Sequence, residues 1–349
     1  MTAARFQRNA LKAAKGLAQG SPPPGKAITG KLPTKTTSSS RLPNRANPHL
    51  SKVISDADAE ATQTRMSPRM MTFLGVSVLG MSTYCGYLYT SYRREVAASQ
   101  SLSIPEDVSD RYNHTARTFD ADVEMSEKLM RMGAKRRDLV QRARGDVLEV
   151  SCGTGRNLDY YELGERRGID GKGRVGIRGC RSLTFVDLSP QMVDITKRKF
   201  EKLHPGVAES ENGRVEFRAQ DARDVPRPQR ILGSSGLLGV QKQEQGYYDT
   251  ILQTMGLCSM PDPAAALRHL GTITEPEHGQ ILLLEHGRSH YDWLNRVLDN
   301  LAPAHADRHG CWWNRDIGQI VQDSGLEVVE EERYHFGTTW RFVLRPRKT

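Results

Sequence analysis

From about residue 105 onward, short apolar segments alternate with longer stretches of helical periodicity. The apolar segments predict strands over Asp146–Val150, Leu183–Asp187, Val215–Ala219, Tyr248–Gln253 and Gly279–His286. Strands that alternate with helices in this way form a parallel sheet covered by helices. A further strand, roughly Tyr334 to Leu344, is predicted to lie antiparallel at the edge of the sheet. The pattern therefore predicts an α/β domain.

Residues 70–92 form a run of 23 residues without a charged side chain, between Arg69 and Arg93. A helix needs about 20 such residues to cross the hydrocarbon core of a bilayer. Tyrosines gather toward one end of the run and arginines flank both ends, as at membrane interfaces. A buried core helix is the alternative, although no neighbouring segment offers it a core. We predict one transmembrane helix over 70–92 and a folded domain over 93–349.

The region before this run is basic at its start and is rich in Ser, Thr and Pro afterwards. Residues 1–20 carry four basic side chains at helical spacing among apolar ones, which is typical of a mitochondrial presequence. A basic tail that targets nothing is the alternative. Residues 21–69 are predicted to be a disordered linker, because such a composition cannot bury a core.

The chain has 349 residues and a net charge of +9, which would suggest a nucleic-acid-binding protein. Residues 1–55 hold ten of the 50 basic residues and no acidic one, so the remainder has 40 basic against 41 acidic residues. The folded part is therefore about neutral, and nucleic acid is not predicted as a partner. The five cysteines form no CxxC pair and predict neither a disulfide framework nor a zinc site.

A glycine turn, Ser151-Cys152-Gly153-Thr154-Gly155, follows the first predicted strand. Such a turn places backbone N–H groups at the carboxyl edge of the sheet, where doubly wound sheets bind their ligands. Glycine also lets a ligand approach the backbone closely. A dinucleotide fingerprint would need a third glycine at position 158, which is Leu158, so an NAD site is disfavoured.

Acidic side chains stand near the carboxyl ends of successive predicted strands. Glu149 lies in the first strand, Asp187 ends the second and Asp221 follows the third. A carboxylate after the second strand can accept hydrogen bonds from both hydroxyls of a ribose, and one after the third can accept from an adenine amino group. Each acid alone is an ordinary solvated strand end, but their order predicts a nucleoside-binding cleft.

Five segments, VLEVSCGTGRN, FVDLSPQM, FRAQDA, YDTILQTMGLCS and GQILLLEHG, resemble the successive motifs of class I S-adenosylmethionine-dependent methyltransferases with a methyltransferase type 11 domain. Residues 111–120 resemble the family's helix that closes over the cofactor, and the resemblance covers roughly 108–345. It implies a Rossmann-like seven-stranded sheet with an antiparallel last strand and S-adenosyl-L-methionine as the cofactor. With the N-terminal anchor added, the chain is similar to fungal methyltransferases of the mitochondrial inner membrane.

The resemblance also implies roles for single residues. The glycine turn would line the methionine part of the cofactor, Asp187 would hold the ribose, and Asp221 would meet the adenine edge. Leu188 and Met192 would pack on the adenine, and Gln253 would lie beneath the sulfonium. The expected cofactor-binding residues are Tyr112, Glu149, Ser151, Gly153, Gly155, Asn157, Asp187, Leu188, Met192, Asp221, Ala222 and Gln253.

Two features depart from the family's pattern. Ser151 stands where the family has its first glycine. The link from Gly155 to Asp187 carries a long insert that contains Asp170, and Asp187 would lose its role if the second strand were misplaced. A second surface insertion, rich in Gly and Gln, is expected over 227–246.

Methyl transfer demands few catalytic groups, because the methyl carbon is already activated and the enzyme mainly aligns it with the acceptor. A general base is needed only if the acceptor must lose a proton. His286 is a weak candidate and His114 a weaker one, since each is more ordinarily a loop residue. His305, His309 and Cys311 resemble a helical metal spacing without a fourth ligand, so no metal site is predicted.

The stretch from His290 to Trp313 is aromatic-rich and falls where this family places its acceptor cap. Three interpretations stay open. It binds a flat apolar acceptor such as a quinone ring, it docks onto the membrane, or Trp293, Trp312 and Trp313 simply pack the helices of the cap.

The leading functional hypothesis is a methyltransferase anchored in the mitochondrial inner membrane. Its acceptor would be a small lipid or quinone-like molecule, or a protein of respiratory-chain assembly. The alternative is a non-catalytic assembly factor for respiratory complexes that retains the fold, and a soluble cytosolic methyltransferase is a third. The strand-end acids favour the enzyme. The basic N-terminal side is expected in the matrix, with the C-terminal domain in the intermembrane space.

Overall fold

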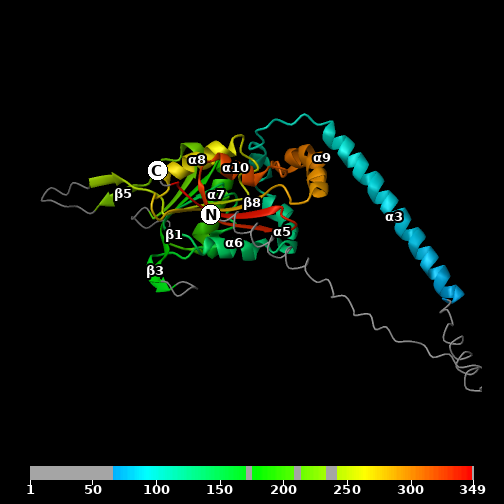
Figure 1. Cartoon of the computed structure of the whole chain (residues 1–349). Coiled ribbons are helices and arrows are strands. Elements are labelled where there is room, and N and C mark those ends of the chain that lie inside the picture. The colour runs from blue at the N-terminus through cyan, green and yellow to red at the C-terminus, as the bar shows by residue number, and fades with distance from the viewer. Residues whose placement is uncertain (1–65, 170–174, 208–213, 233–241, 348–349) are drawn as a thin grey trace, which may run out of the picture. The chain divides into compact units, whose positions relative to one another are not determined.

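The computed structural model describes residues 66–169, 175–207, 214–232 and 242–347 (Figure 1). By its internal contacts the chain divides into two units, Met1–Leu74 and Gly75–Thr349. The predicted presequence, nearly all of the predicted linker and Asp170 lie outside the described residues. The account below concerns the second unit, apart from the first residues of helix α3.

The five predicted parallel strands are present among the described residues in the predicted order, together with strands that the hydrophobic pattern did not predict. The helices are α3 (Pro68–Gln100), α4 (Arg111–Thr115), α5 (Phe119–Leu129), α6 (Met132–Val140), η1 (Leu158–Tyr160), α7 (Pro190–Leu203), η2 (Ala222–Asp224), α8 (Pro263–Ile273), α9 (Asp292–His309) and α10 (Ile317–Asp323). The strands are β1 (Arg144–Val150), β2 (Arg166–Ile169), β3 (Val175–Asp187), β4 (Val215–Ala219), β5 (Gln229–Leu232), β6 (Lys242–Gln245), β7 (Thr250–Thr254), β8 (Gln280–His286), β9 (Glu327–Tyr334) and β10 (Thr339–Arg345).

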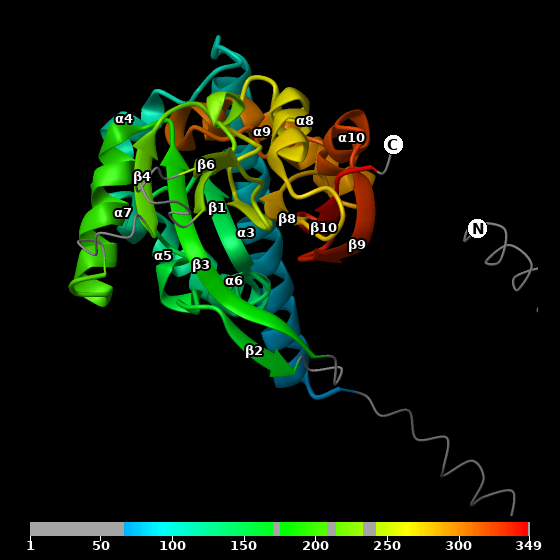
Figure 2. The same ribbon diagram turned by 90° about the vertical axis from the view of Figure 1, so that its left-hand side faces the viewer.

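The central sheet has the spatial order β4-β3-β1-β7-β8-β10-β9 (Figure 2). Strands β4, β3, β1, β7 and β8 pair in parallel, and β10 pairs antiparallel with both β8 and β9. Parallel strands joined through helices build the doubly wound arrangement whose ligands bind at the carboxyl ends of the strands. The predicted Rossmann-like sheet with an antiparallel last strand is confirmed.

The predicted edge position of the last strand is wrong. Strand β10 lies between β8 and β9, and β9 forms the edge. The two strands differ in character, since β10 is buried from Thr339 to Leu344, whereas Glu331 and Glu332 of β9 are exposed. A charged strand suits a sheet edge because it discourages pairing with other chains. The apolar strand therefore occupies the inner position.

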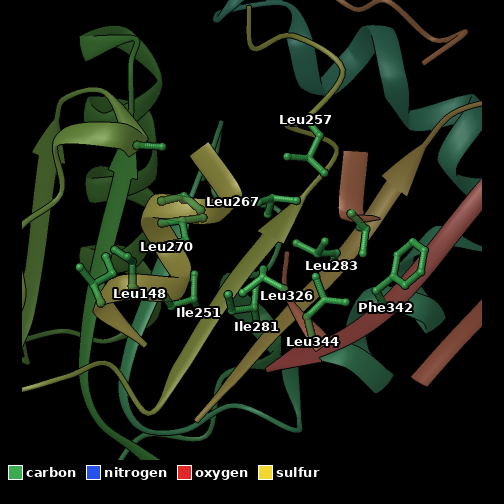
Figure 3. Packing of buried hydrophobic residues seen from close by; sticks show 14 of the residues in the cluster. Leu148, Ile251, Leu257, Leu267, Leu270, Ile281, Leu283, Leu326, Phe342 and Leu344 are labelled. Atoms are coloured by element: carbon green, nitrogen blue, oxygen red, sulfur yellow. The ribbon is translucent and has the colours of Figure 1, made fainter. Parts of the chain in front are cut away.

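Two hydrophobic layers cover the two faces of the sheet. Side chains of a strand alternate between faces, so Leu283 packs with helices α8 and α10 while its neighbour Leu284 packs on the other face, against α6. Figure 3 shows the first layer, in which strand residues meet Leu267 and Leu270 of α8. The second layer includes Met132 of α6 and Phe200 of α7. The paired layers hold the strand ends in a fixed arrangement.

The long insert before Asp187 extends the second predicted strand instead of displacing it. Strand β2 pairs antiparallel with the first part of β3, with Gly168 opposite Gly176. Strand β3 then continues to Asp187, pairing with β1 on one side and β4 on the other. Asp187 therefore keeps the predicted place at a strand end. The second predicted insertion contains the two-stranded antiparallel pair β5–β6.

Among the described residues, one helix is long and apolar enough to cross a membrane. This helix, α3, contains the predicted run 70–92 and continues to Gln100. Its apolar window is not buried against any described part of the chain. Large apolar side chains such as Phe73 and Leu79 are exposed along it.

Candidate functional site

A cleft of about 1040 Å³, its open mouth included, lies at the carboxyl ends of β1, β3, β4 and β7. Clefts of this size hold small-molecule ligands and cofactors. Nine of the predicted cofactor-binding residues line it, namely Tyr112, Ser151, Gly153, Asn157, Asp187, Leu188, Met192, Asp221 and Ala222. Glu149, Gly155 and Gln253 do not line it. The structure thus brings most of the predicted site together.

The glycine turn after β1 forms one wall of the cleft, and its two glycines serve different purposes. Gly153 has a φ of +56°, and a Cβ there would meet no atom within 4 Å, so its backbone borders open space. Gly155 has a φ of +75°, and a Cβ there would lie 2.7 Å from Leu158 Cδ1. Gly153 therefore lets a ligand approach, whereas Gly155 lets the turn pack on the chain that follows it.

Ser151 adopts a left-handed conformation with a φ of +53°, a region that favours glycine. A side chain in this region costs about 1–2 kcal/mol. We expect Ser151→Gly to stabilise the protein by about 1 kcal/mol, offset in part by the greater freedom of glycine in the unfolded chain. For a domain of this size the melting temperature should rise by about 2–4 °C.

Ser151→Ala is the matched control, because it removes the hydroxyl but keeps the Cβ and the strained backbone. Thermal unfolding of both variants checks the prediction. Equal melting temperatures for Ser151→Gly and Ser151→Ala would contradict it.

Asp187 joins the glycine turn to the start of α7. Its Oδ2 accepts a hydrogen bond from Gly153 N at 2.9 Å, and its Oδ1 accepts one from Ser189 N at 2.9 Å. Burial raises the pKa of Asp187, and these backbone donors act in the opposite direction. Ser189 in turn caps α7 by accepting from Met192 N. One carboxylate thus fixes two walls of the cleft.

The end of β4 supplies polar groups on the opposite side of the cleft. The Asp221 carboxylate accepts from Arg223 N at 2.8 Å and pairs with the Arg223 guanidinium, which holds the pKa of Asp221 below its usual range. Gln220 also lines the cleft, and its buried Nε2 has no hydrogen-bond partner among the described residues. A buried donor of this kind is costly unless a ligand satisfies it.

Glu149 faces the protein interior. Its carboxylate accepts from Asn157 Nδ2 at 2.8 Å and from Tyr161 Oη at 2.6 Å. Burial raises the pKa of Glu149 to about 7, although both hydrogen bonds lower it. Asn157 does line the cleft, so Glu149 holds a cleft residue in place without bordering the cleft itself.

Arg136 of α6 is a site residue that sequence reasoning missed. It is 5% exposed, lines the cleft and donates to Asn157 Oδ1 at 3.1 Å and to Thr254 Oγ1 at 2.7 Å. Its second terminal nitrogen pairs with Glu127 at 2.8 Å. Nothing in the run Lys135-Arg136-Arg137 distinguishes the middle cation, because only the tertiary fold buries it.

The floor of the cleft depends on a second missed residue, Glu285. It is fully buried and accepts from Gly256 N at 3.2 Å and Leu257 N at 3.1 Å, while burial raises its pKa. A Cβ at Gly256 would lie 2.6 Å from Ser151 Cβ and 2.7 Å from Gln253 Nε2, so glycine permits this close approach. Gln253 is buried beneath the loop. An acid inside the apolar strand QILLLEH was the available signal for Glu285.

The segment α4–α5 covers the cleft and is tied down at several points. Tyr112 Oη and Ser259 Oγ are 2.8 Å apart, which joins α4 to the loop after β7. Burial raises the pKa of Tyr112, so its phenol stays protonated. Asp120 of α5 accepts from Thr154 Oγ1 at 2.6 Å and pairs with Arg156 and Lys199. These contacts hold α4 and α5 in place beside the cleft.

His286 lies outside the cleft, and its geometry does not support the role of general base. Its ring stacks on Trp313 with centroids 6.5 Å apart, and Trp313 stacks on His305 at 4.0 Å. Burial lowers the pKa of His286 and of His305 to about 4. A base this weak accepts a proton poorly near neutral pH. His114 is exposed and does not line the cleft either.

These two buried histidines predict a pH dependence of stability. Their folded-state pKa values lie below the unfolded value near 6.5, so their contribution is fully present above pH 6.5 and is lost as the pH falls from 6.5 toward 4. Thermal unfolding across this range should show a falling melting temperature. His286→Phe and His305→Phe should each flatten the fall, and an unchanged pH profile in both would contradict the prediction.

The structure separates the tryptophans of the predicted cap. Trp312 Nε1 donates to the Glu106 carbonyl at 3.0 Å, and Trp313 Nε1 donates to the Leu298 carbonyl at 2.9 Å. Neither lines the cleft. Trp313 packs on α9, where its ring also stacks on His305, whereas Trp312 contacts the loops before α4 and after β7 through Glu106 and Cys258. Trp293, in contrast, is 55% exposed at the start of α9. The interpretation that the tryptophans pack the cap helices therefore fits Trp313, Trp312 packs on neighbouring loops, and Trp293 fits neither description.

A family model described as "Methyltransferase domain" matches residues 112–331. "Methyltransferase OMS1, mitochondrial" of Saccharomyces cerevisiae is 38% identical to the chain over 241 residues. This match covers 68% of the chain and 46% of the yeast protein. The chain thus spans about half the length of this curated relative.

Solved structures that align with the chain include the magnesium protoporphyrin IX methyltransferase of Synechocystis PCC 6803 with bound SAH. It is 16% identical, covers 68% of this chain and 97% of its own, and has a TM-score of 0.42. An O-methyltransferase family protein from Burkholderia thailandensis is 17% identical, with coverage of 75% and 70% and a TM-score of 0.45.

Proposed function

The chain belongs to the methyltransferase domain family, and on that basis we propose that it transfers a methyl group from S-adenosyl-L-methionine while anchored in the mitochondrial inner membrane by α3. The observation that carries the proposal is the position of Asp187. Its carboxylate is fixed at the end of β3 by the N–H groups of Gly153 and Ser189, beside a glycine backbone that borders open space.

The residues of the cleft fit S-adenosylmethionine. The Asp187 carboxylate can accept hydrogen bonds from ribose hydroxyls, and exposed Leu188 offers an apolar surface beside it. The unpartnered Nε2 of Gln220 offers a donor near the end of β4. Arg136 supplies a buried positive charge that suits the carboxylate of the methionine part.

When bound, the cofactor supplies a methyl carbon that is already activated by a sulfonium. The work of the chain is then to orient that carbon toward the acceptor and to exclude water, and positioning of this kind can lower a barrier by several kcal/mol. Glu285 holds the Gly256 loop against the glycine turn, which keeps the floor of the cleft rigid. The contact between Tyr112 and Ser259 joins two parts of the cleft lining that come from different elements.

The proposed acceptor is a small lipid or quinone-like molecule. The lining of the cleft includes apolar Phe119, Met260 and Pro261 together with the hydroxyl-bearing side chains of Tyr112 and Ser259. Such a mixture of apolar surface and few polar groups suits an apolar ring or chain with a polar substituent. A protein of respiratory-chain assembly is the other acceptor class, and the experiment below separates the two.

The proposed location is supported by three features of the chain. The yeast relative carries the printed description "mitochondrial". Residues 1–20 have the composition of a presequence, and α3 has the length and exposure of a membrane span. With the basic N-terminal side in the matrix, the catalytic domain faces the intermembrane space.

Methyl transfer by the purified full chain tests the proposal. The chain is incubated with tritiated S-adenosylmethionine and mitochondrial membranes from cells that lack the gene. We expect label in the lipid fraction and none with Asp187→Ala. Label in the protein fraction alone would show that the acceptor is a protein and not a lipid. If calorimetry shows binding of S-adenosylmethionine but no methyl group is transferred, the proposed enzymatic activity is overturned in favour of a non-catalytic assembly factor.

The anchor is tested separately. The full chain in mitochondria is treated with alkaline carbonate, which releases peripheral proteins from membranes. We expect it in the membrane pellet, and its release into the supernatant would overturn the proposed span.

A further inference from the structure

Three exposed aromatic side chains form a cluster on the surface of the domain. Tyr291 and Trp293 come from the start of α9, and Phe336 comes from the turn between β9 and β10. The Tyr291 ring centroid lies 6.4 Å from that of Trp293 and 6.3 Å from that of Phe336. The three side chains are 48%, 55% and 70% exposed. We call Tyr291, Trp293 and Phe336 the aromatic cluster.

The backbone at Phe336 is strained. His335 has a φ of +51° and Phe336 a φ of +57°, so two consecutive side chains occupy the left-handed region. This conformation is an outlier for bulky residues and costs on the order of 1 kcal/mol or more per residue. The turn thus holds a phenylalanine outward at an energetic cost, while packing within the domain gains little from so exposed a ring.

The other half of α9 contacts the last turns of α3, all within the unit Gly75–Thr349. Asn300 lies between Tyr92 and Gln100, since its Nδ2 donates to Tyr92 Oη at 3.0 Å and its Oδ1 accepts from Gln100 Nε2 at 3.4 Å. One turn further along α9, Ala304 N donates to Ser99 Oγ at 3.2 Å. The two helices therefore run in the same sense where they meet.

This arrangement places the aromatic cluster toward the uncharged part of α3. Tyr92 is the last residue of the uncharged run 70–92. Trp293 precedes Asn300 by seven residues, which is two turns on the same face of α9 and about 10 Å along its axis. Because α9 and α3 run in the same sense, moving from Asn300 to Trp293 along α9 corresponds to moving along α3 from its C-terminal end toward the uncharged run. The headgroup regions of a bilayer add about 5–8 Å to each side of its hydrocarbon core, so Trp293 comes within reach of the interface.

We propose that the aromatic cluster inserts into the headgroup interface of the bilayer that α3 spans, and that it provides a second attachment of the domain to the membrane. The inference rests on the proposed membrane span. Tryptophan and tyrosine favour this interface because each combines a large apolar ring with a polar group. The two attachments fix the tilt of the domain over the membrane.

Tryptophan quenching by brominated lipids tests the insertion. The full chain is reconstituted into vesicles of phosphatidylcholine with or without bromine on the acyl chains near the headgroup. All four tryptophans, at positions 293, 312, 313 and 340, lie in the domain. We expect brominated lipid to quench the wild type. Trp293→Phe should abolish the quenching, because it removes the fluorophore of the cluster. Trp312→Phe, which alters a tryptophan outside the cluster, is the matched control and should keep it.

A second variant tests docking itself and leaves the fluorophore in place. Phe336→Ser changes a 70% exposed side chain and should fold normally, but it should reduce the quenching of Trp293. If the wild type resists alkaline carbonate extraction but is not quenched, the docking of the cluster is overturned and the membrane span by α3 is not. The cluster would then face a protein partner. Quenching that persists in Trp293→Phe would also overturn it. Release of the chain by carbonate would overturn both the anchor and the docking.

Discussion

Replacement of Asp187 by alanine is expected to weaken S-adenosylmethionine binding by about 100-fold or more. A hydrogen bond to a charged group contributes about 1.5–3 kcal/mol, and the carboxylate can offer two of them to the ribose. Their joint loss corresponds to about two decades or more of affinity. The variant also removes the acceptor of the Gly153 and Ser189 N–H groups, so the glycine turn loses its tie to α7.

Calorimetric titration of the full chain in detergent measures the affinity, and thermal unfolding without cofactor separates lost binding from lost folding. Asp194→Ala is the matched control, because Asp194 is exposed on α7, close to Asp187 in the chain, and pairs with Arg198 on the same helix. It should bind like the wild type. An Asp187→Ala protein that folds and keeps affinity within a few-fold would remove Asp187 from the site.

Replacement of Arg136 by methionine is expected to destabilise the domain by about 3 kcal/mol, the lower end of what breaking a buried ion pair costs. The lower end applies because Glu127 keeps its second partner, Arg156. Burial works to raise the pKa of Glu127, and the two arginines hold it below its usual range. The variant also leaves Asn157 Oδ1 without the Arg136 donor and removes one of the two donors to Thr254 Oγ1, the other being Asn157 Nδ2.

The loss should appear as a fall in melting temperature of about 6–12 °C for a domain of this size. Binding of S-adenosylmethionine should weaken by at least about tenfold, since Arg136 lines the cleft and the charged partner of a ligand carboxylate is lost. Arg137→Met is the matched control. Its side chain is exposed and lies 5.6 Å from the ring of Tyr160, so its removal should change neither quantity much. Equal effects of the two substitutions would show that burial of Arg136 is unimportant.

The comparison of Glu149 with Asp187 shows how similar sequence signals acquire different roles. Both are acids at the carboxyl ends of parallel strands. Asp187 lines the cleft, whereas Glu149 turns inward to Asn157 and Tyr161. Tyr161 stands twelve residues beyond Glu149, after a turn whose course no local pattern specifies. The prediction that both acids face the cofactor relied on motif order, which does not encode the direction of a side chain.

The local pattern along the chain was sufficient to predict the five parallel strands, the glycine turn and the strand-end position of Asp187. Alternating side chains and the residues that favour turns act over a few neighbours, so they can be read from a short stretch of chain. The long apolar helix α3 could be predicted for the same reason, because an uncharged run depends on composition alone.

Only the tertiary structure determines which charged side chains are buried and which aromatic side chains are exposed. Arg136 reaches Thr254 across 118 positions of the chain, and the strained turn at Phe336 lies beside Tyr291 of a different element. The order of β9 and β10 also depends on tertiary structure. The inner strand is covered on both faces, which suits the apolar β10 and not the charged β9. Burial and strand order depend on contacts between segments far apart in the chain, and no single segment carries that information.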